Sequence, residues 1–225
     1  LVVVSDSRRK DSSRSPWKEW VKRQLLRGYS AALVAGTQSR NYLLQLGMDA
    51  EVIKQPWDVV DNQRFAQLSS QLPVSIPHED QQPFLCVARF IPEKNHALLL
   101  QAFSCYQSQG GMRPLLLVGC GPLEVDLRSA CSQLPRPELV RFECFVQLEQ
   151  LAVHYADAHA LILPSRKDTW GLVVNEAMAV GIPVLVSNDC GCAADLVEHG
   201  ASGWLFNSTD HLGLARCLFN SDNQA

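Results

Sequence analysis

Short apolar segments alternate with helical patterns along most of the sequence, and this alternation limits the possible folds more than any other feature. Apolar runs of strand length lie at 1–5, 31–36, 51–55, 84–89, 115–119, 139–145, 160–165, 183–187 and 203–206. Segments with helical spacing lie between them, at 17–29, 39–46, 96–103, 124–131, 148–158 and 171–180. Strands that alternate with helices predict βαβ units and parallel sheets. We therefore expect an α/β protein.

A polar segment divides these strands into two groups. Residues 66–83 contain three prolines and many polar side chains, which is typical of a linker. We predict that 1–65 is the C-terminal part of a first Rossmann-like unit, that 66–82 is the linker, and that 83–225 is a second Rossmann-like unit. The chain opens with Leu1 inside a strand-like run, so we interpret it as a fragment or a processed chain, with the first unit incomplete.

The composition indicates a globular protein. The chain is 47% apolar and 19% charged, which is enough to bury a core. No apolar run reaches the roughly 18 residues of a membrane-spanning helix. The eight cysteines do not form a disulfide framework, because Cys86, Cys120 and Cys144 lie in or beside apolar runs, and this favours a reduced, cytoplasmic setting. Cys190 and Cys192 have no second pair nearby, so we expect no metal site.

A basic block near the start of the chain allows two interpretations. Residues 8–27 contain eight basic and two acidic side chains, although the whole chain has a net charge of −3. In the helical part of the block, Trp17, Trp20, Val21 and Leu25 fall close to one face. The first interpretation is a solvated helix that packs this face inward. The second is contact with an anionic membrane surface.

Polar and small residues gather where the strands of the second group end. In open α/β sheets, ligands bind beyond the carboxyl ends of the strands. The residues at these ends are Arg89, Lys94, Asn95, Gly119, Gly121, Ser165, Lys167, Asp168, Ser187, Asn188, Asp189 and Gly191. Cations, acids and residues that let the backbone approach closely suit an anionic ligand that carries hydroxyl groups.

Two acids eight residues apart, Asp168 and Glu176, have no obvious role in folding. Asp168 lies in the turn before the helix 171–180, and Glu176 lies about two turns into that helix. The helix start near Gly171 offers free N–H groups to a phosphate, and the strand-end cations Arg89 and Lys94 can neutralise its charge. Glu176 could then accept hydrogen bonds from both hydroxyls of a ribose, while Asp168 faces whatever lies beyond the phosphates.

Each of these elements also has a structural explanation. Gly119 and Gly121 alone could form an ordinary turn, and the two strand-end cations could be surface charges. Ser165 and Asp168 have the spacing of a helix capping box. The histidines that we expect at the surface or at the edge of the core, rather than as general bases, are His96, His154, His159 and His199.

Several longer segments resemble a known family. "ARFIPEKNHALLLQAF", "LLLVGCGP" and "PSRKDTWGLVVNEAMAVGIPVLVS" resemble the donor-binding domain of retaining glycosyltransferases of the GT-B fold, family 4. The resemblance runs in order from residue 83 to about 207. Earlier, "PWKEWVKRQLLRGYSAALVAGTQSRNYLLQLG" and "WDVVDNQRF" resemble the end of that family's acceptor domain and its crossing into the donor domain. The resemblance therefore covers nearly the whole chain.

The resemblance implies roles for particular residues. The catalytic candidates are Arg89, Lys94 and Asp168, and the substrate-binding candidates are Glu176, Gly171, Leu172, Gly119, Gly121 and Thr169. Glu176 would hold the ribose, and Asp168, where the family usually has Glu, would contact the donor sugar. Arg89 and Lys94 would stabilise the charge that develops on the leaving diphosphate. The backbone amides of Gly171 and Leu172 would help to bind it.

The resemblance also implies a function. We expect a transferase that moves a hexose-type sugar from a nucleotide-diphosphate sugar to a glycan or lipid-linked acceptor, with retention and without a metal or other cofactor. We expect no nucleic-acid partner, and a cytoplasmic location at the inner membrane face. A nucleotide-sugar-binding module without turnover, or another GT-B enzyme such as an epimerase or phosphorylase, stays open. Because the acceptor side is incomplete, we expect no transfer by this chain alone.

Overall fold

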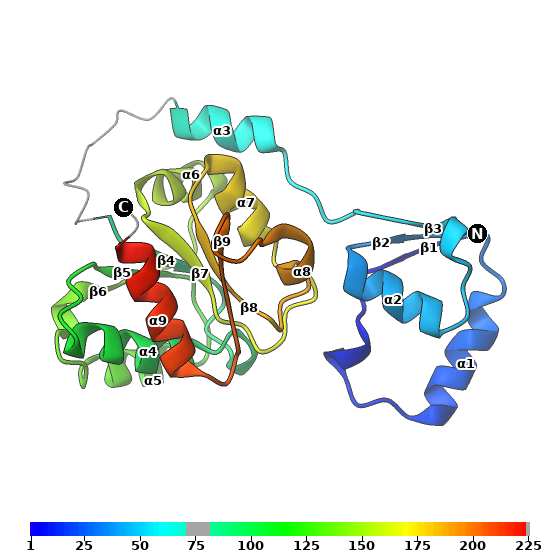
Figure 1. Ribbon diagram of the computed structural model, residues 1–225, viewed down its shortest axis with the longest axis horizontal. Coiled ribbons are helices and arrows are strands. Elements are labelled where there is room, and N and C mark those ends of the chain that lie inside the picture. Colours follow the sequence, from blue (N-terminus) through cyan, green and yellow to red (C-terminus); the bar gives the residue numbers. More distant parts are fainter. Residues whose placement is uncertain (71–81, 224–225) are drawn as a thin grey trace.

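The computed structural model describes residues 1–70 and 82–223, and it shows an α/β protein with two parallel sheets (Figure 1). The three-stranded sheet has the order β1-β2-β3, with β1 (Val2–Ser5), β2 (Ala31–Val34) and β3 (Ile53–Lys54). Helices α1 (Pro16–Leu26) and α2 (Thr37–Gln45) belong to this first unit. The predicted α/β class with parallel sheets is confirmed.

The six-stranded sheet of the second unit has the order β6-β5-β4-β7-β8-β9. Its strands are β4 (Phe84–Val87), β5 (Leu115–Val118), β6 (Val140–Glu143), β7 (Ala160–Leu163), β8 (Val184–Ser187) and β9 (Gly203–Phe206). Its helices are α4 (His96–Ser108), α5 (Glu124–Cys131), α6 (Leu148–Asp157), α7 (Leu172–Val180), α8 (Ala193–Leu196) and α9 (His211–Asp222). The strand order moves outward from β4 in both directions, which places a topological switch between β4 and β7.

Helices cover both faces of this sheet, so its central strands are buried on both sides and are continuously apolar. One apolar cluster joins α4, α5 and α9 to the sheet, and the other joins α6 and α7 to the opposite face. The core that the alternating pattern predicts is therefore present. The pattern missed α8 and α9. The start of α9 carries its own cap, since the Asp210 carboxylate accepts a hydrogen bond from the Gly213 N–H at 2.8 Å.

Helix α3 (Asn62–Ser70) connects the two units and packs on the second one. It contacts α6 and α7, and the buried Phe65 belongs to the apolar cluster on that face. The Phe65 ring meets the Tyr155 ring edge-on at a centroid distance of 6.2 Å. The predicted boundaries at 65 and 82 stay a prediction, because residues 71–81 lie outside the described residues. By its packing, however, α3 belongs with the second unit.

Helix α1 does not pack its apolar face inward. None of its residues is buried, and the stacked rings of Trp17 and Trp20 are 65% and 53% exposed. Polar contacts hold the helix instead: the Tyr42 hydroxyl on α2 donates to the Glu19 carboxylate at 2.9 Å, and Lys22 donates to that hydroxyl at 2.8 Å. The inward-packing interpretation of the basic block is therefore wrong for the described chain. Among the described residues, no helix is both long enough and apolar enough to cross a membrane.

Candidate functional site

The strand ends bring together two of the three catalytic candidates. Lys94 ends the 3₁₀ turn η4 (Pro92–Lys94) after β4, and Asp168 lies after β7, the neighbouring strand. The Lys94 Nζ lies 2.5 Å from the Asp168 Oδ2, and the two side chains are only 18% and 12% exposed. Arg89, the third candidate, is exposed, and its side chain has no partner among the residues that the structure describes. A cation and an acid thus form a partly buried pair at the predicted edge.

The backbone around Asp168 is fixed on two sides. Asp168 bridges to Cys190 after β8, and its carbonyl oxygen accepts the Gly191 N–H at 2.9 Å. The Ser165 hydroxyl lies 3.4 Å from the same carboxylate oxygen that binds Lys94. The capping-box interpretation is wrong, because the residue before the first turn of α7 is Gly171. Asp168 therefore stands outside the helix, at the edge of the sheet.

The start of α7 lies directly after this pair. Gly171 has a φ of 106°, and a Cβ at this position would lie 2.8 Å from the Leu163 Cδ2, so both the conformation and the space require glycine. Helix α7 then begins at Leu172, and the first N–H groups of a helix have no partner within it. Thr169 is half-buried between Asp168 and this helix start. The arrangement offers N–H donors and a positive helix end to an anion.

Glu176 lies on α7 and is held by a residue that the sequence analysis missed. The buried Tyr155 on α6 donates its hydroxyl hydrogen to the Glu176 Oε2 at 2.6 Å. Burial raises the pKa of Glu176, although the hydrogen bond from Tyr155 opposes this effect. Glu176 is the fifth residue of α7, so it lies little more than one turn from the helix start rather than two. The spacing of α6 places Tyr155 on its buried face but contains no signal for this contact.

Gly119 and Gly121 have a packing reason for being glycine. Their loop follows β5 and passes close to the loop after β4, where the Phe90 N–H donates to the Cys120 carbonyl at 2.9 Å. A Cβ at Gly119 would lie 2.1 Å from the Ala88 carbonyl oxygen, and both glycines have positive φ angles. This packing is the structural alternative for the two glycines, and their role in binding substrate stays a prediction.

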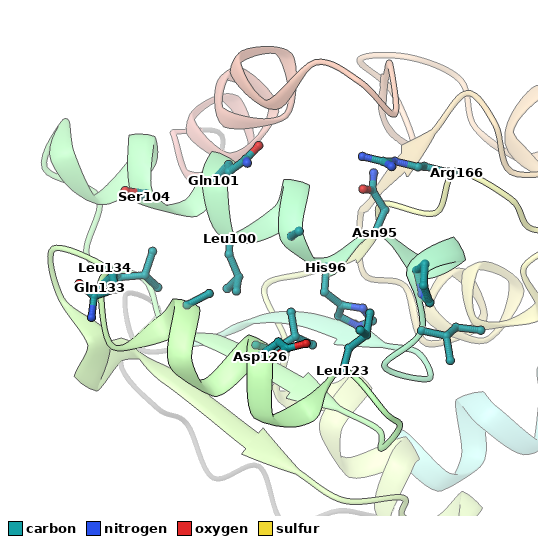
Figure 2. Close-up of a pocket in the computed structure, with 15 residues that line it drawn as sticks. Asn95, His96, Leu100, Gln101, Ser104, Leu123, Asp126, Gln133, Leu134 and Arg166 are labelled. Atoms are coloured by element: carbon teal, nitrogen blue, oxygen red, sulfur yellow. The ribbon is translucent and has the colours of Figure 1, made fainter.

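A cavity lies beside this edge but does not contain the predicted site. It has a volume of about 650 Å³ and lies between α4 and α5 (Figure 2). Ile91 and Pro92 line it, but none of the nine predicted site residues does. The cavity is therefore a feature separate from the candidate site.

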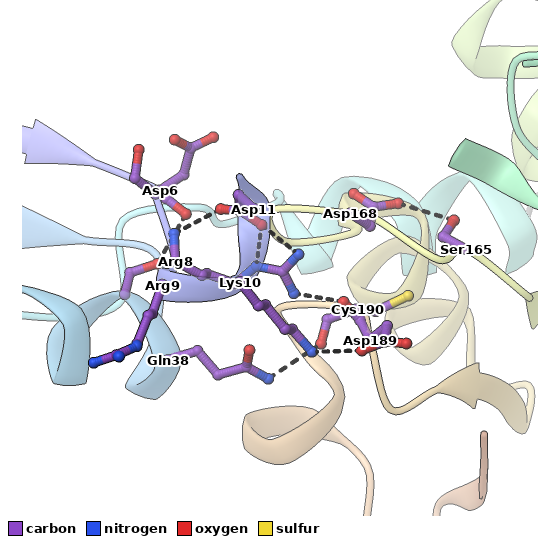
Figure 3. Close-up of polar contacts among 12 residues, drawn as sticks. Asp6, Arg8, Arg9, Lys10, Asp11, Gln38, Ser165, Asp168, Asp189 and Cys190 are labelled. Carbon is purple, nitrogen blue, oxygen red and sulfur yellow. Dashed lines mark hydrogen bonds and ion pairs between the residues drawn. The ribbon is translucent and has the colours of Figure 1, made fainter. Parts of the chain in front are cut away.

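The first unit contacts the same edge of the second unit, as Figure 3 shows. The buried Arg8 side chain donates to the Asp11 carboxylate at 2.7 and 2.9 Å and to the Asp189 carbonyl at 2.5 Å. Lys10 donates to the Asp189 carboxylate at 2.9 Å. Burial alone would raise the pKa of Asp189, but hydrogen bonds from Ser208 and Lys10 outweigh it and lower that pKa. Two residues of the predicted basic block thus join the units.

A second contact between the units lies at the start of α2. The residue before this helix is Gly36, which has no side chain to cap it. The Asp195 carboxylate of the second unit accepts a hydrogen bond from the Thr37 N–H at 3.1 Å, and another from the Thr37 hydroxyl. A Cβ at Gly36 would lie 2.3 Å from the Trp170 ring, so glycine is needed for this close approach. Asp195 therefore caps a helix of the other unit.

Among the described residues, no group of three or more His, Cys, Asp or Glu side chains is placed to hold a metal ion. Cys190 and Cys192 are buried, and burial raises the pKa of both thiols.

Comparison with known proteins assigns the chain to a family. Residues 71–218 match the family described as Glycosyl transferases group 1. The chain belongs to this family. Among curated relatives, the amylovoran biosynthesis glycosyltransferase AmsK of Erwinia amylovora is 31% identical over 140 residues, which are 60% of this chain and 34% of AmsK. WcaL of Salmonella typhimurium, named for colanic acid biosynthesis, is 32% identical over 165 residues, which are 71% of this chain and 39% of WcaL. The chain thus spans well under half the length of these relatives.

Solved structures show the same fold. The crystal structure of Anabaena Alr3699/HepE in complex with UDP matches 100% of this chain and 63% of its own, with a TM-score of 0.80 at 22% sequence identity. At this level of identity the likeness shows the fold alone. The group 1 chain therefore has the GT-B type of α/β fold that the sequence analysis expected.

Proposed function

We propose that this chain is the donor-binding part of a retaining glycosyltransferase, which moves a hexose from a nucleotide-diphosphate sugar to a glycan or lipid-linked acceptor. The observation that carries the proposal is the Lys94–Asp168 pair beside the start of α7, with Glu176 little more than one turn further along. Along the length of such a donor, Asp168 suits the sugar, Lys94 and the start of α7 suit the diphosphate, and Glu176 suits the ribose.

The diphosphate would bind between the cations and the helix start. The Lys94 ammonium has three N–H donors, and Asp168 takes only one of them, so two can reach phosphate oxygens. Arg89 is exposed, and its guanidinium can form bidentate hydrogen bonds with a phosphate. The free N–H groups of Gly171 and Leu172 would bind another oxygen. These donors would stabilise the negative charge that grows on the leaving diphosphate, a role that a metal ion plays in other enzymes.

The two acids would each use the oxygen that the protein leaves open. The Asp168 Oδ2 binds Lys94, whereas its Oδ1 has no hydrogen-bond partner within the described ranges. The Glu176 Oε2 binds Tyr155, and its Oε1 likewise has no partner there. We assign the open oxygen of Asp168 to the donor sugar and that of Glu176 to the ribose. Tyr155 would fix the Glu176 carboxylate in one orientation, which reduces the ordering needed when the donor binds.

The proposed acceptor and location are supported by the names of relatives and by the surface and cysteine content of the chain. Relatives named for amylovoran and colanic acid biosynthesis support a glycan acceptor. The exposed Trp17 and Trp20, beside the cations of α1, suit peripheral contact with an anionic membrane and a lipid-linked acceptor. All eight cysteines are free, which suits the cytoplasmic face.

Calorimetric titration with UDP, GDP and their sugar derivatives tests the ribose assignment. The variant Glu176→Ala should bind nucleotide about 10- to 150-fold more weakly, the equivalent of about 1.5–3 kcal/mol for charge-assisted hydrogen bonds. Glu198→Ala is the matched control, because Glu198 is an exposed glutamate that is not among the proposed site residues. Unchanged affinity in a folded Glu176→Ala protein would remove Glu176 from the site.

Turnover separates the transferase from a binding module. In the full-length protein, Arg89→Ala should lower kcat by roughly 10²–10³-fold if Arg89 stabilises the leaving group. NMR of the first product formed should show the anomeric configuration of the donor. A full-length protein that binds the donor but neither transfers nor hydrolyses the sugar would favour the binding module instead.

A further inference from the structure

The cavity between α4 and α5 has the size and lining of a small-molecule site (Figure 2). Its volume of about 650 Å³ lies within the range of about 300–1,000 Å³ that is typical of ligand pockets. Four leucines line it, from α4, from α5 and from the segments directly before and after α5: Leu100, Leu127, Leu123 and Leu134. The Lys94–Asp168 pair does not line it, so the proposed donor site does not explain it.

His96, the first residue of α4, lines this cavity and has an imidazole ring without hydrogen-bond partners. The side chain is only 2% exposed, and neither ring nitrogen has a hydrogen-bond partner among the residues that the structure describes. The expectation that His96 lies at the surface or the edge of the core is therefore wrong. Figure 2 shows the ring extending from α4 toward Leu123, between the two helices. A buried polar group without a partner is unfavourable, so His96, which lines the cavity, calls for a partner inside it.

The chemistry of the ring defines that partner. Burial lowers the pKa of His96 to about 4, and the positive charge of Lys94 acts in the same direction. The imidazole is therefore neutral near pH 7, with one nitrogen donating and the other accepting. The Phe90 ring packs edge-on against it at a centroid distance of 5.0 Å and offers neither a donor nor an acceptor. A hydroxyl group, which also donates and accepts, complements this ring.

The charges at the rim indicate a neutral ligand. Arg166 and Asp126 both line the cavity and both are exposed, and they carry opposite charges. Figure 2 places them on different sides of α4, Arg166 beyond its first turn and Asp126 on α5. Neither sign of charge dominates the opening, so electrostatic attraction does not select an anion or a cation.

We propose that the cavity between α4 and α5 binds a small uncharged amphipathic molecule, whose apolar body lies against the leucines and whose hydroxyl bonds to His96. This site is separate from the proposed donor site and does not depend on it. The competing occupant is water, which would form hydrogen bonds with the His96 ring without any preference for an apolar ligand.

A pair of probes tests the proposal on the 225-residue chain. 2-Naphthol carries the apolar body and the hydroxyl, and 2-methylnaphthalene replaces the hydroxyl by a methyl group. Calorimetry or intrinsic probe fluorescence should show that 2-naphthol binds about 2- to 13-fold more tightly, the ratio expected for one net hydrogen bond. In His96→Phe, the two probes should bind equally. Saturating UDP should not displace either probe.

A blocking variant makes the test independent of His96. Ala130 lines the cavity but is exposed on α5, so Ala130→Trp should fill the cavity without disturbing the core and should weaken both probes. Val125→Trp, at an exposed position of the same helix that does not line the cavity, should change neither. Failure of 2-naphthol to bind, equal binding of both probes to the unmodified chain, or binding that Ala130→Trp leaves intact would each overturn the proposal. Should His96→Phe fail to fold, the probe pair and Ala130→Trp still decide the question.

Discussion

Replacement of Lys94 and Asp168, singly and together, measures whether the contributions of the two side chains to stability are coupled. The variants are Lys94→Met, Asp168→Asn and their combination, which remove the charges but keep most of the volume. The 2.5 Å contact joins side chains that are 18% and 12% exposed, so the pair lies between a solvated ion pair and a fully buried one. Surface pairs contribute about 0–1 kcal/mol, whereas breaking a buried pair costs about 3–5 kcal/mol.

The intermediate environment sets the expected magnitude. A hydrogen bond between charged groups contributes about 1.5–3 kcal/mol to the free energy of unfolding, so each single variant should lose about that much. Both variants remove the same bond, and the double variant should therefore lose little more than either single one. Independent residues would instead give a loss of about 3–6 kcal/mol for the double variant, twice the single value.

Urea unfolding at pH 7, followed by circular dichroism, supplies the three free energies. The control cycle is Arg128→Met with Glu124→Gln, because this pair within α5 is 53% and 31% exposed and should show a coupling of only about 0.3–0.5 kcal/mol. If the losses of the two single variants add up to that of the double variant within about 0.5 kcal/mol, energetic coupling between Lys94 and Asp168 is refuted. The same variants test their proposed roles: Lys94→Met should weaken UDP and nucleotide-sugar alike, and Asp168→Asn should weaken the nucleotide-sugar more than UDP.

Three further predictions concern other parts of the chain. Because the pKa of His96 is lowered to about 4 in the folded chain, the unfolded chain binds more protons between pH 6.5 and 4. Acidification across this range should therefore remove about 3 kcal/mol from the free energy of unfolding, measured by urea titration. The variant His96→Phe should lack this part of the pH dependence. If α1 contacts membranes, the chain should sediment with anionic liposomes, less at high salt and less in the Trp17→Ala/Trp20→Ala double variant; equal sedimentation with neutral liposomes would contradict this. Asp195→Ala should remove the cap on Thr37, destabilise α2 by about 0.5–2 kcal/mol and speed hydrogen exchange in its first turn, whereas unchanged exchange would show that the cap contributes nothing.

The strand ends of the second unit could be predicted because local patterns determine them. Every strand of the described chain lies in a predicted run, and the central strands β4, β5, β7 and β8, which helices cover on both faces, are continuously apolar. Parallel strands place their carboxyl ends at one edge, and this rule alone brought Lys94 and Asp168 together. Gly171 and Gly181, both with positive φ, bound α7 where the sequence places its start and stop.

Contacts between distant residues could not be predicted in this way. Tyr155 reaches Glu176 because α6 and α7 lie side by side, and Arg8 reaches Asp189 across 181 positions of sequence. Neither pairing leaves a periodic trace in the chain. The polar composition of α3 likewise suggests a linker, since a single large side chain, Phe65, accounts for its buried contact. Tertiary packing determines both contacts and the docking of α3.

The docking of α3 determines where the chain can bend if the two units move relative to each other. Because Phe65 is embedded in the second unit, α3 must travel with that unit as one rigid piece. The bending then falls on the segment between β3 and Val60, because Val60 also packs on the second unit; this segment is extended in Figure 1. The axis of such a motion lies near the N-terminal end of α3. Opening would first separate Arg8 and Thr37 from their partners, and it would leave the ring of Tyr155, and with it the carboxylate of Glu176, undisturbed.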